Sequence, residues 1–346
     1  MAEIRVGLVG YGPAGSFFHA PLIAATDGLV LTAVVTRDPG RQAEVAARYG
    51  AVGVPGVERL WEACDLVVVA SPNRTHVRVA TEALEHGKAV VVDKPFARTA
   101  GEAREVARLA RERGLLLTVF QNRRWDGDYL TVRRLLAEGT LGEVLRLESR
   151  FERWRPVPKG GWREAGGPEE AGGLLYDLGS HLVDQALHLL GPVREVYCES
   201  DVRRAGVASD DDTFIALRHT GGARSHLWAS SVTARPGPRF RVLGSAAAYT
   251  KQGLDVQEER LRAGMAPDAE GFGAEDADRW GVAGTDTESH KVPTEPGAYL
   301  DFYREVARAL RTGSAPPVSP DSAIEALTVI EAARLSATER SVVRLP

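Results

Sequence analysis

A glycine-rich turn near the start of the chain constrains the fold more than any other feature. Residues 4–9 read IRVGLV, which is typical of a buried strand, and GYGPAG follows at 10–15 before a helical pattern. GxGxxG between a strand and a helix permits a tight turn and leaves a helix N-terminus open to an anion. We therefore expect a dinucleotide pyrophosphate here, although the motif alone leaves open a turn without a ligand. The residues concerned are Gly10, Gly12, Pro13, Ala14 and Gly15.

Strand and helix patterns alternate through the first third of the chain. The sequence predicts further strands at 29–35, 66–70, 89–92 and 115–120, and helices at 39–49, 77–86 and 100–113. Continuous apolar strands separated by helices indicate a parallel, doubly wound sheet. We therefore predict an α/β Rossmann domain over residues 1–122, with its ligand beyond the carboxyl ends of the strands.

Polar residues follow three of these strands. Ser71, Pro72, Asn73 and His76 follow the strand at 66–70. Asp93 and Lys94 follow the strand at 89–92, and Asn122 follows the strand at 115–120. Parallel strands end at the same edge of a sheet, so these side chains are expected to face the ligand. Lys94 is the most notable, because Pro95 follows it directly. The alternative for Lys94 is a solvated lysine paired with Asp93.

Residues 123–346 read as a second, α+β domain with a largely antiparallel open sheet. Strands are predicted at 143–152, 193–201, 212–219, 223–232 and 240–243, and helices at 128–138, 298–311 and 322–339. The last helix is a candidate for packing back toward the first domain. Residues 254–297 are polar and glycine-rich, and we expect a long irregular excursion there.

A helix is also predicted within residues 172–191, GGLLYDLGSHLVDQALHLLG. Asp177 and His181 are four residues apart, so an α-helix places them on one face. Asp184 and His188 repeat that spacing two turns later. An acid and an imidazole beside adjacent glycines suit proton transfer, but the pair alone equally fits a structural role.

Composition and charge exclude several classes of function. With 43 Lys and Arg against 47 Asp and Glu, scattered along the chain, no nucleic-acid-binding surface is expected. The two cysteines predict neither a disulfide framework nor a zinc site, and residues 210–212 (DDD) are interpreted as a charged turn rather than a metal site. The apolar runs are strand-sized and the N-terminus lacks a signal-peptide pattern. We expect a cytoplasmic protein without a metal or a membrane partner.

Taken together, these motifs resemble the Gfo/Idh/MocA oxidoreductases. The resemblance rests on GYGPAG at 10–15, SPNRTH at 71–76, DKP at 93–95 and GGLLYDLGSHLVDQ at 172–185. The family motif is usually EKP, so Asp93 is a conservative departure that keeps the lysine. FHAPLI at 18–23 and QNRRWDGDYLT at 121–131 resemble one subgroup, the NADP-dependent scyllo-inositol dehydrogenase-like proteins. The resemblance implies that Lys94, Asp177 and His181 form the catalytic group, and that Trp162 and Arg163 approach the nicotinamide and substrate.

The residues after the second predicted strand bear on the choice of cofactor. NAD-binding Rossmann domains usually carry an acidic residue there, which binds the ribose 2′-hydroxyl. Here the strand is followed by Thr36 and Arg37, which suit the 2′-phosphate of NADP, and Arg41 could add a second charge. Asp38 would become the ribose ligand if the strand ran further than predicted.

The sequence-based hypothesis is therefore an NADP-dependent dehydrogenase for a polyol or sugar, with an inositol favoured. His181 would accept the hydroxyl proton, Asp177 would orient the substrate or the imidazole, and Lys94 would stabilise the developing alkoxide. Two alternatives remain, a NAD-dependent glycosidase of the same fold and a non-catalytic NADP-binding sensor. A homo-oligomer, dimer or tetramer, is expected because the outer face of the predicted sheet needs cover. Leu227 and Val232 are predicted to lie on that face.

Overall fold

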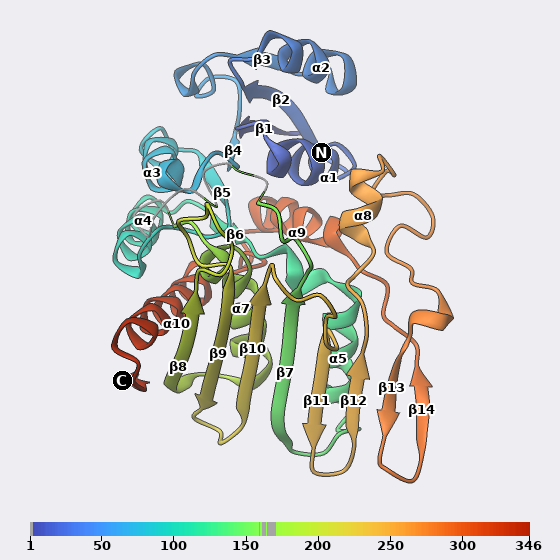
Figure 1. Ribbon diagram of the computed structural model, residues 1–346. Coiled ribbons are helices and arrows are strands. Elements are labelled where there is room, and N and C mark those ends of the chain that lie inside the picture. Colours follow the sequence, from blue (N-terminus) through green and yellow to red (C-terminus); the bar gives the residue numbers. More distant parts are fainter. Residues whose placement is uncertain (1–2, 159, 161–163, 165–170) are drawn as a thin grey trace. The chain divides into compact units, whose positions relative to one another are not determined.

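The computed structural model describes residues 3–158, 160, 164 and 171–346 (Figure 1). The predicted site residues Trp162 and Arg163 lie outside the described residues. The chain divides into two compact units, each assembled from three stretches. The first contains 1–122, 257–272 and 298–324, and the second contains 123–256, 273–297 and 325–346.

The first unit is built on a parallel sheet of six strands among the described residues. Its strands are β1 (Ile4–Val9), β2 (Leu29–Val35), β3 (Val52–Val54), β4 (Leu66–Val69), β5 (Ala89–Asp93) and β6 (Leu117–Phe120). Their spatial order is β3-β2-β1-β4-β5-β6, so the strand order reverses between β1 and β4. This confirms the predicted doubly wound Rossmann sheet, and a topological switch point of this kind is where such sheets bind ligands.

The helices of this unit come from three separate stretches of the chain. They are α1 (Ala20–Ala24), α2 (Pro39–Tyr49), α3 (His76–Glu85), α4 (Ala100–Arg113), α8 (Gln257–Arg262) and α9 (Tyr299–Thr312). Asp38 caps the first turn of α2 by accepting from the Arg41 N–H, and Gly50 ends that helix with a positive φ of 65°. Thr99 and Gly114 cap α4 in the same way.

The second unit contains a mixed sheet of nine strands among the described residues. Its strands are β7 (Val144–Glu152), β8 (Val193–Asp201), β9 (Asp212–His219), β10 (Arg224–Ser230), β11 (Phe240–Gly244), β12 (Ala248–Lys251), β13 (Gly281–Gly284), β14 (Ser289–Val292) and β15 (Val343–Arg344). The order is β14-β13-β12-β11-β7-β10-β9-β8-β15, and β7 and β10 form its parallel pair. The largely antiparallel sheet is therefore confirmed.

Residues 254–297 contain more regular structure than predicted. Helix α8 and the β13–β14 hairpin both lie in this range, and the hairpin extends one edge of the nine-stranded sheet. The prediction of an irregular excursion was therefore wrong in part. The hairpin strands have four residues each, and the pairing of β13 with β12 is non-local, so a polar and glycine-rich pattern did not reveal them.

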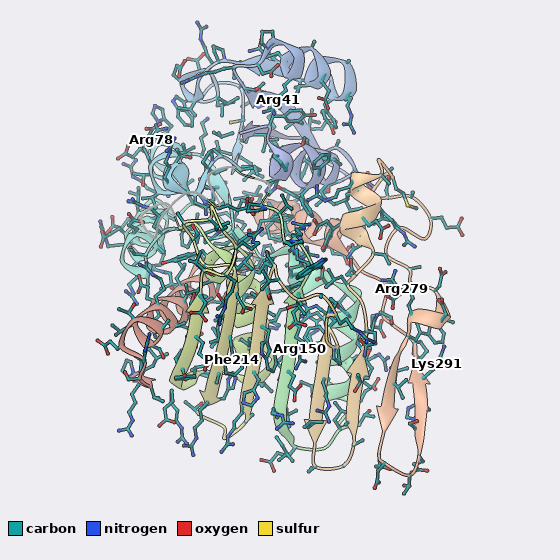
Figure 2. The ribbon with its side chains drawn as sticks, in the orientation of Figure 1. Arg41, Arg78, Arg150, Phe214, Arg279 and Lys291 are labelled. Carbon is teal, nitrogen blue, oxygen red and sulfur yellow. The ribbon has the colours of Figure 1, made fainter. Side chains whose placement is uncertain are left out.

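Helices α5 (Gly127–Ala137), α7 (Ser180–Leu190) and the second half of α10 (Pro320–Glu339) pack on one face of the second sheet. In Figure 1, α5 and α7 lie behind the strands. Leu227 belongs to this core and is fully buried, so its predicted place on the outer face was wrong. Side chains alternate along a strand, and the opposite face instead carries Trp228 and Phe214, with ring centroids 5.1 Å apart. Arg150, labelled with Phe214 in Figure 2, lies 3.9 Å above the Trp228 ring.

Among the described residues, no helix is long and apolar enough to cross a membrane.

Candidate functional site

The glycines of the first turn have different structural roles. A Cβ at Gly10 would lie 2.7 Å from the Ala70 carbonyl oxygen, and one at Gly15 would lie 2.1 Å from that of Gly10. Both positions therefore require glycine for packing of the turn against β4 and against itself. A Cβ at Gly12 would meet no atom within 4 Å, so this backbone faces open space. That opening is where a pyrophosphate would approach a Rossmann turn.

The segment after this turn begins as a π-helix over Ala14–His19 and continues as α1. The Ser16 N–H and hydroxyl both donate to the Gly12 carbonyl, at 2.8 and 2.9 Å. π-helical turns are rare and concentrate at functional sites. The wider turn also carries His19 into the interior, where the residue has no exposed surface.

The end of β2 agrees with the predicted boundary. The strand ends at Val35, and Thr36 is buried, with its N–H donating to the Val54 carbonyl at 2.9 Å. Arg37 and Arg41 are exposed, and no ion pair joins either side chain to another described residue. Asp38 lies outside the strand and accepts from the Arg41 N–H at 3.1 Å. The position directly after β2 thus offers a hydroxyl and a guanidinium rather than a carboxylate.

His76 links the ends of β4 and β5. Its Nε2 lies 2.8 Å from the Ser71 carbonyl oxygen and its Nδ1 lies 2.9 Å from that of Pro95. Burial lowers the pKa of His76, which favours the neutral ring, and a neutral ring donates to one of these carbonyls at a time. Ser71 also shares a hydrogen bond with Thr75 at 2.6 Å. His76 therefore holds the two predicted loops together.

Lys94 directly follows β5 and is partly buried, and its peptide bond to Pro95 is cis. The Lys94 N–H donates to the Asp93 carboxylate at 2.8 Å. Burial by itself raises the pKa of Asp93, but the His19 ring and the charge of Lys94 outweigh it, so the pKa is lowered. Asp93 is therefore an anion at neutral pH, next to the lysine ammonium. Asn73 and Asn122 follow β4 and β6, the two strands on either side of β5, and both are buried.

In the second unit, Asp177 lies in a π-helical turn, Leu175–Gly179, and His181 lies in the first turn of α7. Asp177 is partly exposed, whereas His181 is 4% exposed, with its ring 6.2 Å from that of Phe151. The sequence predicted one continuous helix, and the π-helical turn is the difference. Both predicted site segments, one in each unit, thus contain a π-helical turn.

Asp210 anchors the start of the Asp177 segment. Its carboxylate accepts from the Leu175 N–H at 2.7 Å and from the Thr213 hydroxyl at 3.0 Å. Gly173 has a positive φ of 85°, and a Cβ there would lie 1.9 Å from the Asp210 carboxylate. Burial raises the pKa of Asp210. The glycine at 173 is therefore required by a helix-capping carboxylate that sequence reasoning had assigned only to a charged turn.

The second Asp–His spacing on α7 does not form a pair. Asp184 accepts two hydrogen bonds from Arg124, at 2.8 and 2.6 Å, and His188 Nδ1 lies 2.5 Å from the Tyr129 hydroxyl. Burial lowers the pKa of His188. Asp184 and His188 therefore tie α7 to the segment that follows β6.

A buried arginine was missed by the sequence analysis. Arg239 is 2% exposed, donates to Gln185 Oε1 at 2.8 Å and lies 3.3 Å from the Asp128 carboxylate. Its guanidinium also lies 4.0 Å above the Phe151 ring, whose neighbour is His181. Asp128 belongs to the QNRRWDGDYLT segment. Part of this motif therefore supports α7, through the contact of Asp128 with Arg239.

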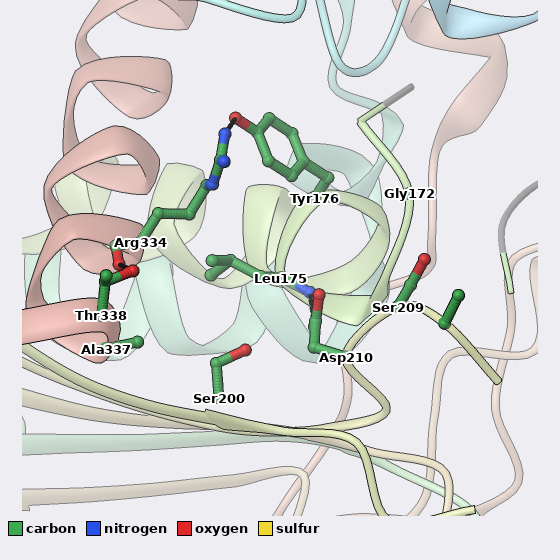
Figure 3. Close-up of a pocket in the computed structure, with 10 residues that line it drawn as sticks. Gly172, Leu175, Tyr176, Ser200, Ser209, Asp210, Arg334, Ala337 and Thr338 are labelled. Atoms are coloured by element: carbon green, nitrogen blue, oxygen red, sulfur yellow. Dashed lines mark hydrogen bonds between the residues drawn. The ribbon is translucent and has the colours of Figure 1, made fainter. Parts of the chain in front are cut away.

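A cavity of about 360 Å³ lies beside the Asp177 segment within the second unit (Figure 3). Its wall includes Leu175, Ser200, Ser209 and Asp210, and Tyr176 accepts a hydrogen bond from Arg334 of α10 at 3.1 Å. Asp210, which accepts from the Leu175 N–H at the start of the Asp177 segment, is thus also part of the cavity wall.

The described residues contain no group of three or more His, Cys, Asp or Glu side chains arranged to hold a metal ion. Within DDD, Asp211 accepts from the Arg204 side chain at 2.8 Å, and Asp212 lies 3.5 Å from Arg203. These carboxylates serve contacts within the protein, and Asp212 is the first residue of β9 rather than part of a turn.

The first unit fits a nicotinamide dinucleotide. Its glycine turn leaves backbone open at Gly12 beside the switch point of the sheet, and exposed arginines at 37 and 41 follow β2. Backbone N–H groups and arginines are the donors that pyrophosphate and 2′-phosphate groups bind.

Comparison with known proteins extends this picture over the whole chain. Residues 4–121 match the family described as oxidoreductase family, NAD-binding Rossmann fold, and residues 133–345 match its C-terminal alpha/beta domain. The scyllo-inositol 2-dehydrogenase (NADP(+)) IolW of Bacillus subtilis is 35% identical, over 99% of this chain and 96% of that protein. The uncharacterized oxidoreductase YdgJ of Escherichia coli is 41% identical over 98% of each chain. The solved structure of the oxidoreductase yvaA from Bacillus subtilis superposes with a TM-score of 0.94 at 35% identity, covering 100% of this chain and 99% of that one.

Proposed function

Because this chain belongs to the Gfo/Idh/MocA oxidoreductase family, we propose that it is an NADP-dependent dehydrogenase of polyol or sugar secondary alcohols. An inositol is the favoured substrate. The observation that carries the proposal is the position of Lys94, at the carboxyl end of β5 on the edge of the sheet that also carries the open glycine turn. The whole-length similarity to a scyllo-inositol dehydrogenase supports the substrate class.

The first unit would hold the cofactor. We propose that the turn from Gly10 to Gly15 binds the pyrophosphate, that Thr36 and Arg37 bind the 2′-phosphate, and that the loops at Ser71–His76 and Asn122 contact the rest of the dinucleotide. When bound, the cofactor supplies the acceptor for a hydride. Trp162 and Arg163 remain proposed contacts of the nicotinamide and substrate.

The chain's own residues would move the proton. His181 accepts the proton of the substrate hydroxyl, since a neutral imidazole is an effective base near neutral pH. Asp177, one helical turn earlier, orients the substrate or the imidazole. Lys94 donates a hydrogen bond to the reacting oxygen and stabilises its developing negative charge. Each residue thus has a separate role in one alcohol oxidation.

A substrate panel tests this proposal directly. Inositols, aldoses and simple diols are incubated with NADP, and reduction is followed by NADPH absorbance. We expect stoichiometric NADPH formation with a cyclic polyol or a sugar. Cleavage of glycosides with no net cofactor consumption would instead identify the NAD-dependent glycosidase alternative, and NADP binding without turnover of any compound would favour the sensor.

Replacing Arg37 by alanine is expected to reduce the preference for NADP over NAD by about ten- to a hundredfold, because a charge-assisted hydrogen bond contributes about 1.5–3 kcal/mol. The measurement is kcat/KM for both cofactors. Arg108→Ala is the control, since Arg108 is exposed on α4 and its ion pairs with described residues are to Glu105 and Glu112 of its own helix. A wild type that prefers NAD would make Asp38 the ribose ligand and overturn the NADP assignment.

We also propose that the protein is a homo-oligomer. The support is the outer face of the nine-stranded sheet, where Phe214 and Trp228 lie with Arg150 on the side opposite the helices. A second copy is the cover that would bury these rings. Light scattering that finds only single chains would contradict this.

A further inference from the structure

A buried chain of polar side chains leads to the segment that carries Lys94. Tyr303 of α9 and His19 have no exposed surface, and the Tyr303 hydroxyl lies 2.6 Å from His19 Nδ1. On the other edge of the ring, Nε2 lies 3.8 Å from the Asp93 carboxylate. Asp93 in turn accepts from the Lys94 N–H at 2.8 Å. All four residues belong to the first unit.

The protonation states of the outer groups orient the ring between them. Burial and the charge of Asp93 raise the pKa of Tyr303 well above its ordinary value, so its hydroxyl keeps its proton. Asp93 is ionised, with a lowered pKa. A tyrosine that donates to Nδ1 leaves the proton on Nε2, which faces the carboxylate. The ring also packs on Phe120, with centroids 4.4 Å apart. Lys94 and His76 are further titratable groups near this carboxylate.

We propose that His19, supported by Tyr303, is a positioning residue that sets the orientation of Lys94 through Asp93. The inference rests on the proposed role of Lys94 in the dehydrogenase. Its physical basis is that the single carboxylate of Asp93 is shared by the His19 ring and the Lys94 backbone, so a change in one contact shifts the other.

The geometry explains why a histidine serves this purpose. The gap of 3.8 Å is an ion-pair distance and is too long for a hydrogen bond, so Nε2 remains buried without a hydrogen-bond acceptor among the described residues. A buried unsatisfied donor is costly, and it favours an approach of the carboxylate toward the ring. An approach of Asp93 to the ring would therefore also shift the Lys94 backbone N–H that donates to it.

Two substitutions at His19 separate positioning from packing. His19→Asn keeps a polar group near the position of Nδ1 but loses the group facing Asp93. His19→Gln extends an amide toward the position of Nε2 and can still donate to the carboxylate. If His19 acts through Asp93, the Asn variant lowers kcat by about tenfold with the KM for NADP nearly unchanged, and the Gln variant recovers most of the activity. Thermal unfolding of both variants reports whether each is folded.

A double-mutant cycle with Lys94→Met tests the route of the effect. We expect His19→Asn to cause no further loss when Lys94 is already absent. An equal loss in both backgrounds, or equal activity of the Asn and Gln variants, would overturn the inference. Full activity of Lys94→Met alone would instead overturn the proposed role of Lys94.

A measurement that needs no substrate distinguishes failure of the positioning role of His19 from failure of the proposed role of Lys94. An amine-reactive acylating reagent is applied to the purified protein, and modification of Lys94 is compared by mass spectrometry with that of Lys88 at the opposite end of β5. If Lys94 is less firmly held in His19→Asn, the ratio of Lys94 modification to Lys88 modification should rise by about threefold or more. An unchanged ratio in a folded variant would contradict the positioning role, whatever the substrate.

Discussion

Replacement of His181 by alanine is expected to lower kcat by about 10²–10⁴-fold, the range for loss of a positioned acid–base group. His181 is 4% exposed at the start of α7, so the proposed base is held by the packing of that helix. The cofactor contacts proposed above lie outside α7, and NADP binding should therefore survive. Stopped-flow kinetics and NADP titration measure the two effects separately.

The control for this variant is His290→Ala, since His290 is exposed on β14. A second readout is the pH profile of kcat in the oxidative direction. Activity of the wild type should rise with pH as the imidazole loses its proton, and the residual activity of His181→Ala should lack that rise. Near-normal turnover, or a wild-type profile that stays flat while chemistry limits the rate, would remove His181 as the base.

Replacement of Lys94 by alanine is expected to lower kcat by a similar factor, about 10²–10⁴-fold, because an alkoxide would form without a charged donor. Lys94→Arg should restore part of the activity if positive charge alone contributes. Lys88→Ala is the matched control, because Lys88 precedes the same strand at its other end. The measurement is steady-state kcat together with NADPH affinity by fluorescence.

Loss of cofactor affinity with unchanged kcat would assign Lys94 to binding rather than to catalysis. Normal kcat and normal affinity would return it to the alternative of a solvated lysine paired with Asp93. Both outcomes can be distinguished from misfolding by thermal unfolding of the variant.

Sequence alone determined most of the first 122 residues, because most of the elements there carry their own local signal. The strand Leu29–Val35 and the helices Pro39–Tyr49 and Ala100–Arg113 have the predicted bounds. Apolar runs form buried parallel strands, and glycines at 50 and 114 supply the positive φ that ends the helices.

The π-helical turns and the short β3 strand were not predicted from the sequence. A π-turn differs from an α-turn by one residue in its hydrogen bonding, and apolar spacing over five or six residues cannot distinguish the two. A three-residue strand such as β3, with a glycine at its centre, is stabilised mainly by its neighbour in the sheet, so it too lacks a local signal.

The surroundings of the candidate residues were decided by tertiary structure. Asp184 and His188 have the spacing of a helical pair, yet Arg124 and Tyr129 bind them instead. An arginine that donates two hydrogen bonds satisfies a buried carboxylate better than a neutral imidazole does. The spacing of residues in the sequence does not predict that Arg124 is this partner.

The sequence by itself determined a Rossmann unit, an antiparallel second unit and the residue types expected to carry the chemistry. Only the tertiary structure placed His19 between Tyr303 and Asp93, since 284 residues separate the tyrosine from the histidine. Local patterns report backbone conformation and burial, whereas the partner of a buried polar group depends on which distant segments fold against it.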